Sequence, residues 1–136
     1  MSELTIEART DKLDEVLAFV DRELEEFDCP PKVQMQIDVA VEEIFVNIAS
    51  YAYGQKEGMA TLIFEESGDR TAVTITFMDE GVPYDPLGKP DPDITLGAED
   101  RQIGGLGIFM VKKSMDRVDY EYKNGKNCLT IGKKLF

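Results

Sequence analysis

The sequence contains no histidine and no tryptophan, and it has only two cysteines, Cys29 and Cys128. Without histidine the chain cannot form a Ser-His-Asp triad, the usual histidine-containing metal sites or a phosphohistidine of its own. The two cysteines lack the CxxC spacing, so they suggest neither a disulfide framework nor a zinc site, and idle thiols are the simplest interpretation. Histidine chemistry is therefore excluded for this chain.

Basic residues are also scarce, with 15 Lys and Arg against 27 Asp and Glu and a formal net charge of −12. Nucleic-acid-binding proteins concentrate Lys and Arg, so this balance disfavours nucleic acid and equally an anionic membrane surface. No apolar run approaches the roughly 20 residues that span a bilayer, and the first residues lack the pattern of a signal peptide. We expect a cytoplasmic protein that binds neither nucleic acid nor membrane.

The first half of the chain predicts one strand and two amphipathic helices. Residues 4–8 alternate between apolar and polar, which is typical of a half-buried strand. Apolar residues then recur at intervals of three and four over 11–27, behind Thr10 as a plausible N-cap. A second helix is predicted from Pro31, since proline is favoured at the first helical position, to about Tyr53.

The second half predicts two hairpins that flank a loop and a third helix. Strands over 59–66 and 71–78 are joined by a Ser-Gly-Asp turn, and Asn124-Gly125 is a strong hairpin signal. Residues 82–102 carry four prolines without periodicity, as in a functional lid or a disordered segment. We therefore predict a single α+β domain over 1–136, a two-layer sandwich with helices on one face of a mixed, mainly antiparallel sheet.

The stretch Gly104-Gly105-Leu106-Gly107 places glycines where the third helix should begin. Each glycine inside a helix costs about 1 kcal/mol relative to alanine. The free N–H groups and the positive dipole end of a helix N-terminus favour anions, phosphates above all. No Lys-Ser or Lys-Thr follows, so this is no Walker A loop, and by themselves the glycines fit loop capping or close packing equally well.

Two further places carry polar residues in a suggestive pattern. Glu43 and Asn47 lie one helical turn apart beside the apolar stripe, where they suit Mg²⁺ and leave a carboxylate free as a base. Asp79 stands before Gly81 at the end of a strand and could accept a hydrogen bond from a purine amino group. The plainer interpretations are an exposed polar helix face and an ordinary Asp/Gly/Pro turn.

Taken together, these motifs resemble the ATP-binding fold shared by gyrase, Hsp90, the histidine kinases and MutL. The order E-x-x-x-N, D-x-G-x-P-x-D-P and GGLGI looks most like its small bacterial branch, the anti-sigma factor serine-protein kinases. Gyrase, Hsp90 and MutL relatives carry additional domains, and a histidine kinase needs a phosphoacceptor histidine that this chain lacks. The resemblance covers most of the chain.

The resemblance implies a role for each matching position. Glu43 would take the proton from an attacking hydroxyl, and Asn47 would hold Mg²⁺ that bridges the phosphates of ATP. Asp79 would accept from the adenine amino group, with Gly81 and Thr130 helping through water.

The glycine stretch would lie under the phosphates of the nucleotide. Gly104, Gly105, Leu106 and Gly107 would contact ATP, with the N–H groups of Gly105 and Gly107 facing the phosphates. Residues 87–103 would form a lid over the nucleotide. Arg101 is placed like the family's lid arginine that reaches the γ-phosphate, although a solvated surface arginine fits the sequence as well.

The leading hypothesis is therefore an ATP- and Mg²⁺-dependent protein serine/threonine kinase of the anti-sigma type. It would phosphorylate a small antagonist protein and sequester a sigma factor or a similar regulator, and the resemblance implies a homodimer. The alternative is a nucleotide-gated binding module that holds a partner without phosphorylating it. A third interpretation, an α+β scaffold with no ligand, stays open at this point.

Overall fold

The computed structural model describes residues 1–54, 56–88 and 105–136. The elements follow the order β-α-α-β-β-α-β-β that the sequence predicts. They are β1 (Ser2–Glu7), α1 (Leu13–Glu25), α2 (Pro31–Asn47), β2 (Met59–Glu66), β3 (Ala72–Asp79), α3 (Gly105–Ser114), β4 (Arg117–Lys123) and β5 (Lys126–Lys134). Short helical turns lie at Thr10–Lys12, Ile48–Ala52 and Pro86–Gly88.

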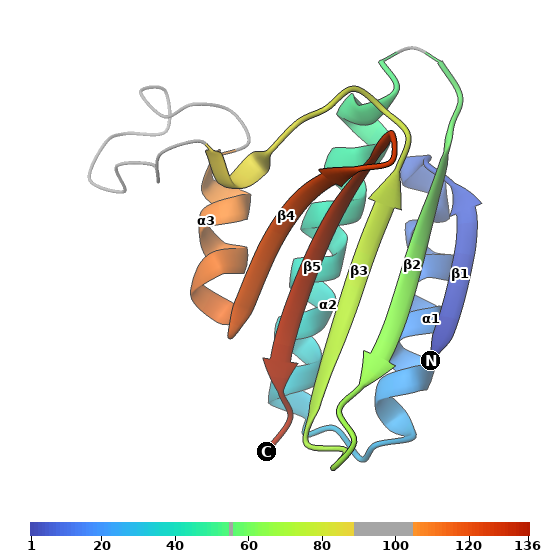
Figure 1. The fold of residues 1–136 in the computed structure, drawn as a ribbon. Helices are drawn as coiled ribbons and strands as arrows, with labels where there is room; N and C mark the ends of the chain where they lie inside the picture. Colours follow the sequence, from blue (N-terminus) through green and yellow to red (C-terminus); the bar gives the residue numbers. More distant parts are fainter. Residues whose placement is uncertain (55, 89–104) are drawn as a thin grey trace.

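The five described strands form one sheet in the order β1-β2-β3-β5-β4, and all three described α-helices cover the same face of it (Figure 1). The α+β two-layer sandwich is therefore confirmed. All four strand pairings are antiparallel, so the expected parallel component of a mixed sheet is absent among these strands. None of the helices in this part of the chain is long and apolar enough to cross a membrane.

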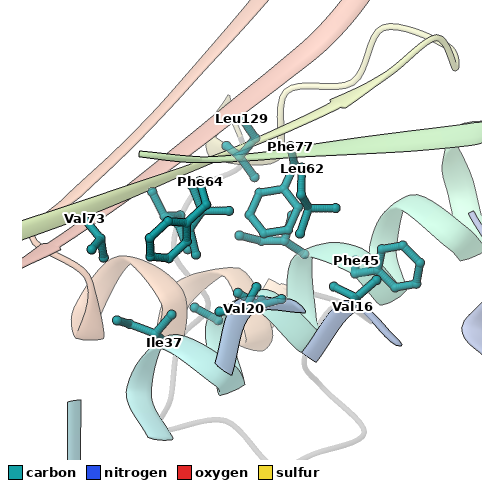
Figure 2. Close-up of a cluster of buried hydrophobic side chains, with 14 of the residues drawn as sticks. Val16, Val20, Ile37, Phe45, Leu62, Phe64, Val73, Phe77 and Leu129 are labelled. Atoms are coloured by element: carbon teal, nitrogen blue, oxygen red, sulfur yellow. The ribbon is translucent and has the colours of Figure 1, made fainter. Parts of the chain in front are cut away.

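The core lies between the sheet and the helices. Every second residue of β3, from Val73 to Phe77, faces the helices and is buried, as period-two alternation requires. Figure 2 shows the labelled side chains of the sheet meeting those of α1 and α2. The labelled members are Val16, Val20, Ile37, Phe45, Leu62, Phe64, Val73, Phe77 and Leu129.

The helix ends agree with the sequence in part. Pro31 occupies the first turn of α2, as predicted, and Gly54 adopts a positive φ of 61° just beyond the turn that follows the helix. Thr10 is not an N-cap, because it lies inside a 3-10 turn and makes no capping hydrogen bond. The helical segment that we predict to run to Tyr53 is α-helical only as far as Asn47.

Beyond Asn47 the chain continues as a π-helical turn over Ile48–Ala52. Such wider turns occur mostly as single turns and often lie at functional sites. Here the turn brings the Ala52 carbonyl to the segment after β3, where it accepts a hydrogen bond of 3.0 Å from the Val82 N–H. The end of α2 is thereby tied to the end of β3.

Candidate functional site

A cavity of about 150 Å³ lies at one end of the sheet, where α2 and β3 end and where β5 and α3 begin. Most of its walls are apolar, and three of its polar side chains come from different elements, namely Asn47, Asp79 and Asn127. The apolar walls include Ile44, Ile48, Phe77, Ile108 and Leu129. Apolar walls with a few converging polar groups are typical of a small-molecule site.

Asp79 is the last residue of β3 and is buried, with 6% of its surface exposed. Its Oδ1 accepts hydrogen bonds from the Gly81 N–H at 2.9 Å and from Asn127 Nδ2 at 2.9 Å. Its Oδ2 accepts no hydrogen bond from any described residue. Because Asp79 lines the cavity, Oδ2 is available to accept a hydrogen bond from a ligand there.

Gly81 contributes through its lack of a side chain. A Cβ at this position would lie 2.2 Å from the Ala52 carbonyl oxygen, so only glycine allows the chain to pass so close to the π-helical turn. Its N–H donates to Asp79, but Gly81 is not among the residues that line the cavity. Gly81 therefore supports Asp79 through a hydrogen bond and does not contact the cavity itself.

Glu43 and Asn47 face the same way on α2, as the spacing predicts. Asn47 Nδ2 donates to Glu43 Oε1 at 3.3 Å, which orients the carboxylate and leaves Asn47 Oδ1 without a hydrogen bond among the described residues. Both side chains are partly buried, and Asn47 lines the cavity. The pair is therefore built into the site and is no solvated helix face.

The first turn of α3 meets Glu43. A Cβ at Gly107 would lie 1.9 Å from Glu43 Oε1, so the carboxylate occupies the space that a side chain at this position would fill. Gly105 and Leu106 begin the helix, and Ile108 in the same turn lines the cavity. A carboxylate, an amide oxygen and a helix N-terminus thus converge beside the cavity.

Almost the whole chain matches a known protein family. A family model described as the histidine kinase-like ATPase domain matches residues 6–133. The chain belongs to this family. Membership in an ATPase domain family implies ATP as the ligand.

Curated relatives of the chain carry the names that the motifs led us to expect. The chain is 28% identical over 119 residues to an anti-sigma F factor of Clostridium acetobutylicum, covering 86% of this chain and 76% of the relative. It is 26% identical over 101 residues to the serine/threonine-protein kinase BtrW of Bordetella bronchiseptica, covering 74% and 70%. The resemblance to anti-sigma factors and serine-protein kinases is therefore confirmed.

A solved structure supports the fold. The RsbU and RsbW domains of a Mycobacterium tuberculosis protein match with a TM-score of 0.65 at 16% identity. The match covers 99% of this chain and 33% of that chain, so the chain spans about a third of the larger protein.

One residue that we expected at the site lies away from the cavity. The hydroxyl groups of Thr130 and Thr76 share a hydrogen bond, with 3.0 Å between their oxygens. Both side chains lie on the face of the sheet that the helices leave open. Asp79 pairs with Asn127, three residues along each strand from the pair of Thr76 and Thr130. Because side chains alternate between the faces of a sheet, the side chain of Asp79 points to the opposite face. The structure does not bring Thr130 to the cavity.

Asn127 of β5 lies beside Asp79 in the cavity, where we had expected Thr130, and the sequence analysis missed it. It is buried, with 7% of its surface exposed, and lies directly opposite Asp79 in the sheet. A signal was present, because Asn127 is in phase with the buried Leu129 and Ile131 of β5. A polar residue at an inward-facing position of a strand marks a site.

Two expected residues and the lid cannot be placed. Arg101 and Gly104 lie outside the described residues, as does most of the predicted lid over 87–103. Within the described residues there is no group of three or more His, Cys, Asp or Glu side chains that could hold a metal ion. Mg²⁺ does not need such a group, because it is commonly held by one or two protein ligands together with substrate phosphates. Asn47 Oδ1 is suited to be one of these ligands.

Proposed function

We propose that this chain is an ATP-dependent protein serine/threonine kinase of the anti-sigma type. Its substrate is a serine or threonine of a small antagonist protein, and its regulatory partner is a sigma factor or a similar protein. The names of the relatives support both partners. The observation that carries the proposal is the contact of the Glu43 carboxylate with Gly107 at the start of α3.

In this proposal the adenine occupies the apolar cavity and its amino group donates to Asp79 Oδ2. The phosphates then lie at the N-terminus of α3, where free N–H groups and the helix dipole stabilise negative charge. Asn47 Oδ1 would hold Mg²⁺ against the phosphates, and the ion would supply charge neutralisation. Phosphoryl transfer depends mostly on such positioning and charge stabilisation.

Glu43 acts as the general base. Its carboxylate takes the proton of the substrate hydroxyl while the hydroxyl oxygen bonds to the γ-phosphorus and the bond to ADP breaks. The hydrogen bond from Asn47 Nδ2 holds the carboxylate beside the first turn of α3. A positioned base contributes typically 100- to 10,000-fold to such a rate.

The test measures transfer of labelled γ-phosphate from ATP, in the presence of Mg²⁺, to a candidate antagonist protein. We expect transfer by the wild type, and a loss of at least about 100-fold in Glu43→Gln with ATP binding retained. The matched control is Glu42→Gln, which removes the same charge from an exposed neighbour on α2.

Equal transfer by Glu43→Gln and wild type would show that Glu43 is not the base. If label stays on ATP while the nucleotide changes the stability of the complex, the chain is a nucleotide-gated binding module instead. The resemblance also leads us to propose a homodimer, which sedimentation equilibrium measures directly.

A further inference from the structure

The four shortest hydrogen bonds of the Asn127 side chain join it to four different groups around the cavity. Its Nδ2 donates to Asp79 Oδ1 and to the Val82 carbonyl, each at 2.9 Å. Its Oδ1 accepts from the Tyr84 N–H at 3.1 Å and from the Tyr120 hydroxyl. The side chain thus connects β5 to the end of β3, to the segment that follows it and to β4.

Only one orientation of the Asn127 amide satisfies these groups. Asp79 and Val82 present acceptors to one end, while the Tyr84 N–H and the Tyr120 hydroxyl present donors to the other. A flipped amide would place donors against donors and leave buried groups unpaired. Burial raises the pKa of Tyr120, and the carboxylates of Asp85 and Asp79 raise it further, so the hydroxyl keeps the proton that it donates.

The hydrogen bond from Asn127 makes the two carboxylate oxygens of Asp79 different. Asn127 and the Gly81 N–H together occupy Oδ1, so the carboxyl group is held in one rotation and Oδ2 is left for the cavity. Without the Asn127 donor, a carboxylate can rotate and present either oxygen or neither. Val82 and Tyr84, which also bond to Asn127, line the same cavity.

We propose that Asn127 is a positioning residue for nucleobase selection, holding Asp79 so that one oxygen accepts from a 6-amino purine. The inference rests on the proposed ATP site and adds the residue that sets its preference for adenine. Asn127 acts through Asp79 and the cavity wall and is no catalytic residue.

The experiment compares binding of ATP with binding of purine riboside triphosphate, which lacks the 6-amino group, by titration calorimetry. A hydrogen bond to a charged group corresponds to about tenfold or more in affinity, so the wild type should prefer ATP by at least that factor. In Asn127→Ala the preference should fall to within about threefold, because Asp79 loses its fixed orientation.

Two further variants keep the test decisive. Asn127→Leu keeps the branch at Cγ but has no hydrogen that it could donate to Asp79, so it should lose the preference even if Asn127→Ala folds poorly. Thr130→Val alters the opposite face of the same strand and should keep the wild-type preference.

A purely structural role would lower the affinity for both nucleotides by the same factor. An unchanged preference in the Asn127 variants therefore overturns the inference while the ATP site stands. If the wild type binds neither nucleotide, the proposed function fails and the role of Asn127 fails with it.

Discussion

Replacement of Gly107 by alanine should separate the stability of α3 from the chemistry of the site. Alanine is favoured over glycine inside a helix by about 1 kcal/mol. Its Cβ would lie 1.9 Å from Glu43 Oε1, so the carboxylate has to retreat by about 1.5 Å to reach ordinary contact. Glu43 can do so by rotating its side chain, at a cost of about 0.5–1.5 kcal/mol. The two effects nearly cancel, and the free energy of unfolding should change by less than about 1 kcal/mol.

The effect on activity should be much larger. A displacement of about 1 Å in a reacting group can cost about 100-fold in rate, so Gly107→Ala should lose most of its phosphoryl transfer. Urea unfolding measures the stability and γ-phosphate transfer measures the activity. The control is Gly68→Ala, where a Cβ would meet no atom within 4 Å.

Either of two results would refute this reasoning. Transfer within threefold of the wild type would mean that the Glu43 carboxylate need not lie against Gly107. A loss of more than about 3 kcal/mol in stability would mean that the contact cannot relax by rotation of one side chain.

Further predictions concern the α1–α2 interface and the turns. Asp21 and Asp38 each have a buried oxygen without a hydrogen-bond partner among the described residues, and burial together with Asp21 raises the pKa of Asp38 to about 7. The folded state therefore binds a proton more tightly than the unfolded chain, so stability should fall as pH rises from about 4 to about 8. Asp38→Asn should flatten this slope in urea titrations and, since Asp38 is partly exposed, stabilise the fold at pH 8 by about 1–2 kcal/mol. An unchanged slope would contradict the raised pKa of Asp38. Gly81→Ala should destabilise the fold by about 1–3 kcal/mol, because its Cβ would lie 2.2 Å from the backbone oxygen of Ala52, and an unchanged urea midpoint would count against that close approach.

Local patterns were sufficient to predict most of the fold. Apolar spacing predicted α1, and the Asn124-Gly125 turn does have positive φ at both residues, 55° and 76°. The helix ends were harder. The π-helical turn after Asn47 accompanies a hydrogen bond between Ala52 and the distant Val82, which local sequence does not encode. Thr10 lies inside a 3-10 turn, and helix boundaries are the least certain feature of a sequence pattern.

The candidate site also has one part that the sequence predicts and one part that depends on the fold. Glu43 and Asn47 are one turn apart on one helix, so their proximity follows from helical geometry alone. The choice between Asn127 and Thr130 depends on the register of β3 against β5, which joins segments 48 residues apart in the chain. Alternation with Leu129 and Ile131 indicates that Asn127 faces inward, but its pairing with Asp79 depends on that register and required the structure.

The central claim, that the cavity binds the adenine of ATP through Asp79, is tested most directly by calorimetry with Mg-ATP on the wild type and on Asp79→Asn. The asparagine oxygen can still accept from Gly81 and Asn127, so the fold should persist, while its amide group presents a donor to the adenine amino group. We predict that the wild type binds and that Asp79→Asn binds at least about tenfold more weakly. Equal affinity in the two proteins, or no binding by the wild type, would contradict the account.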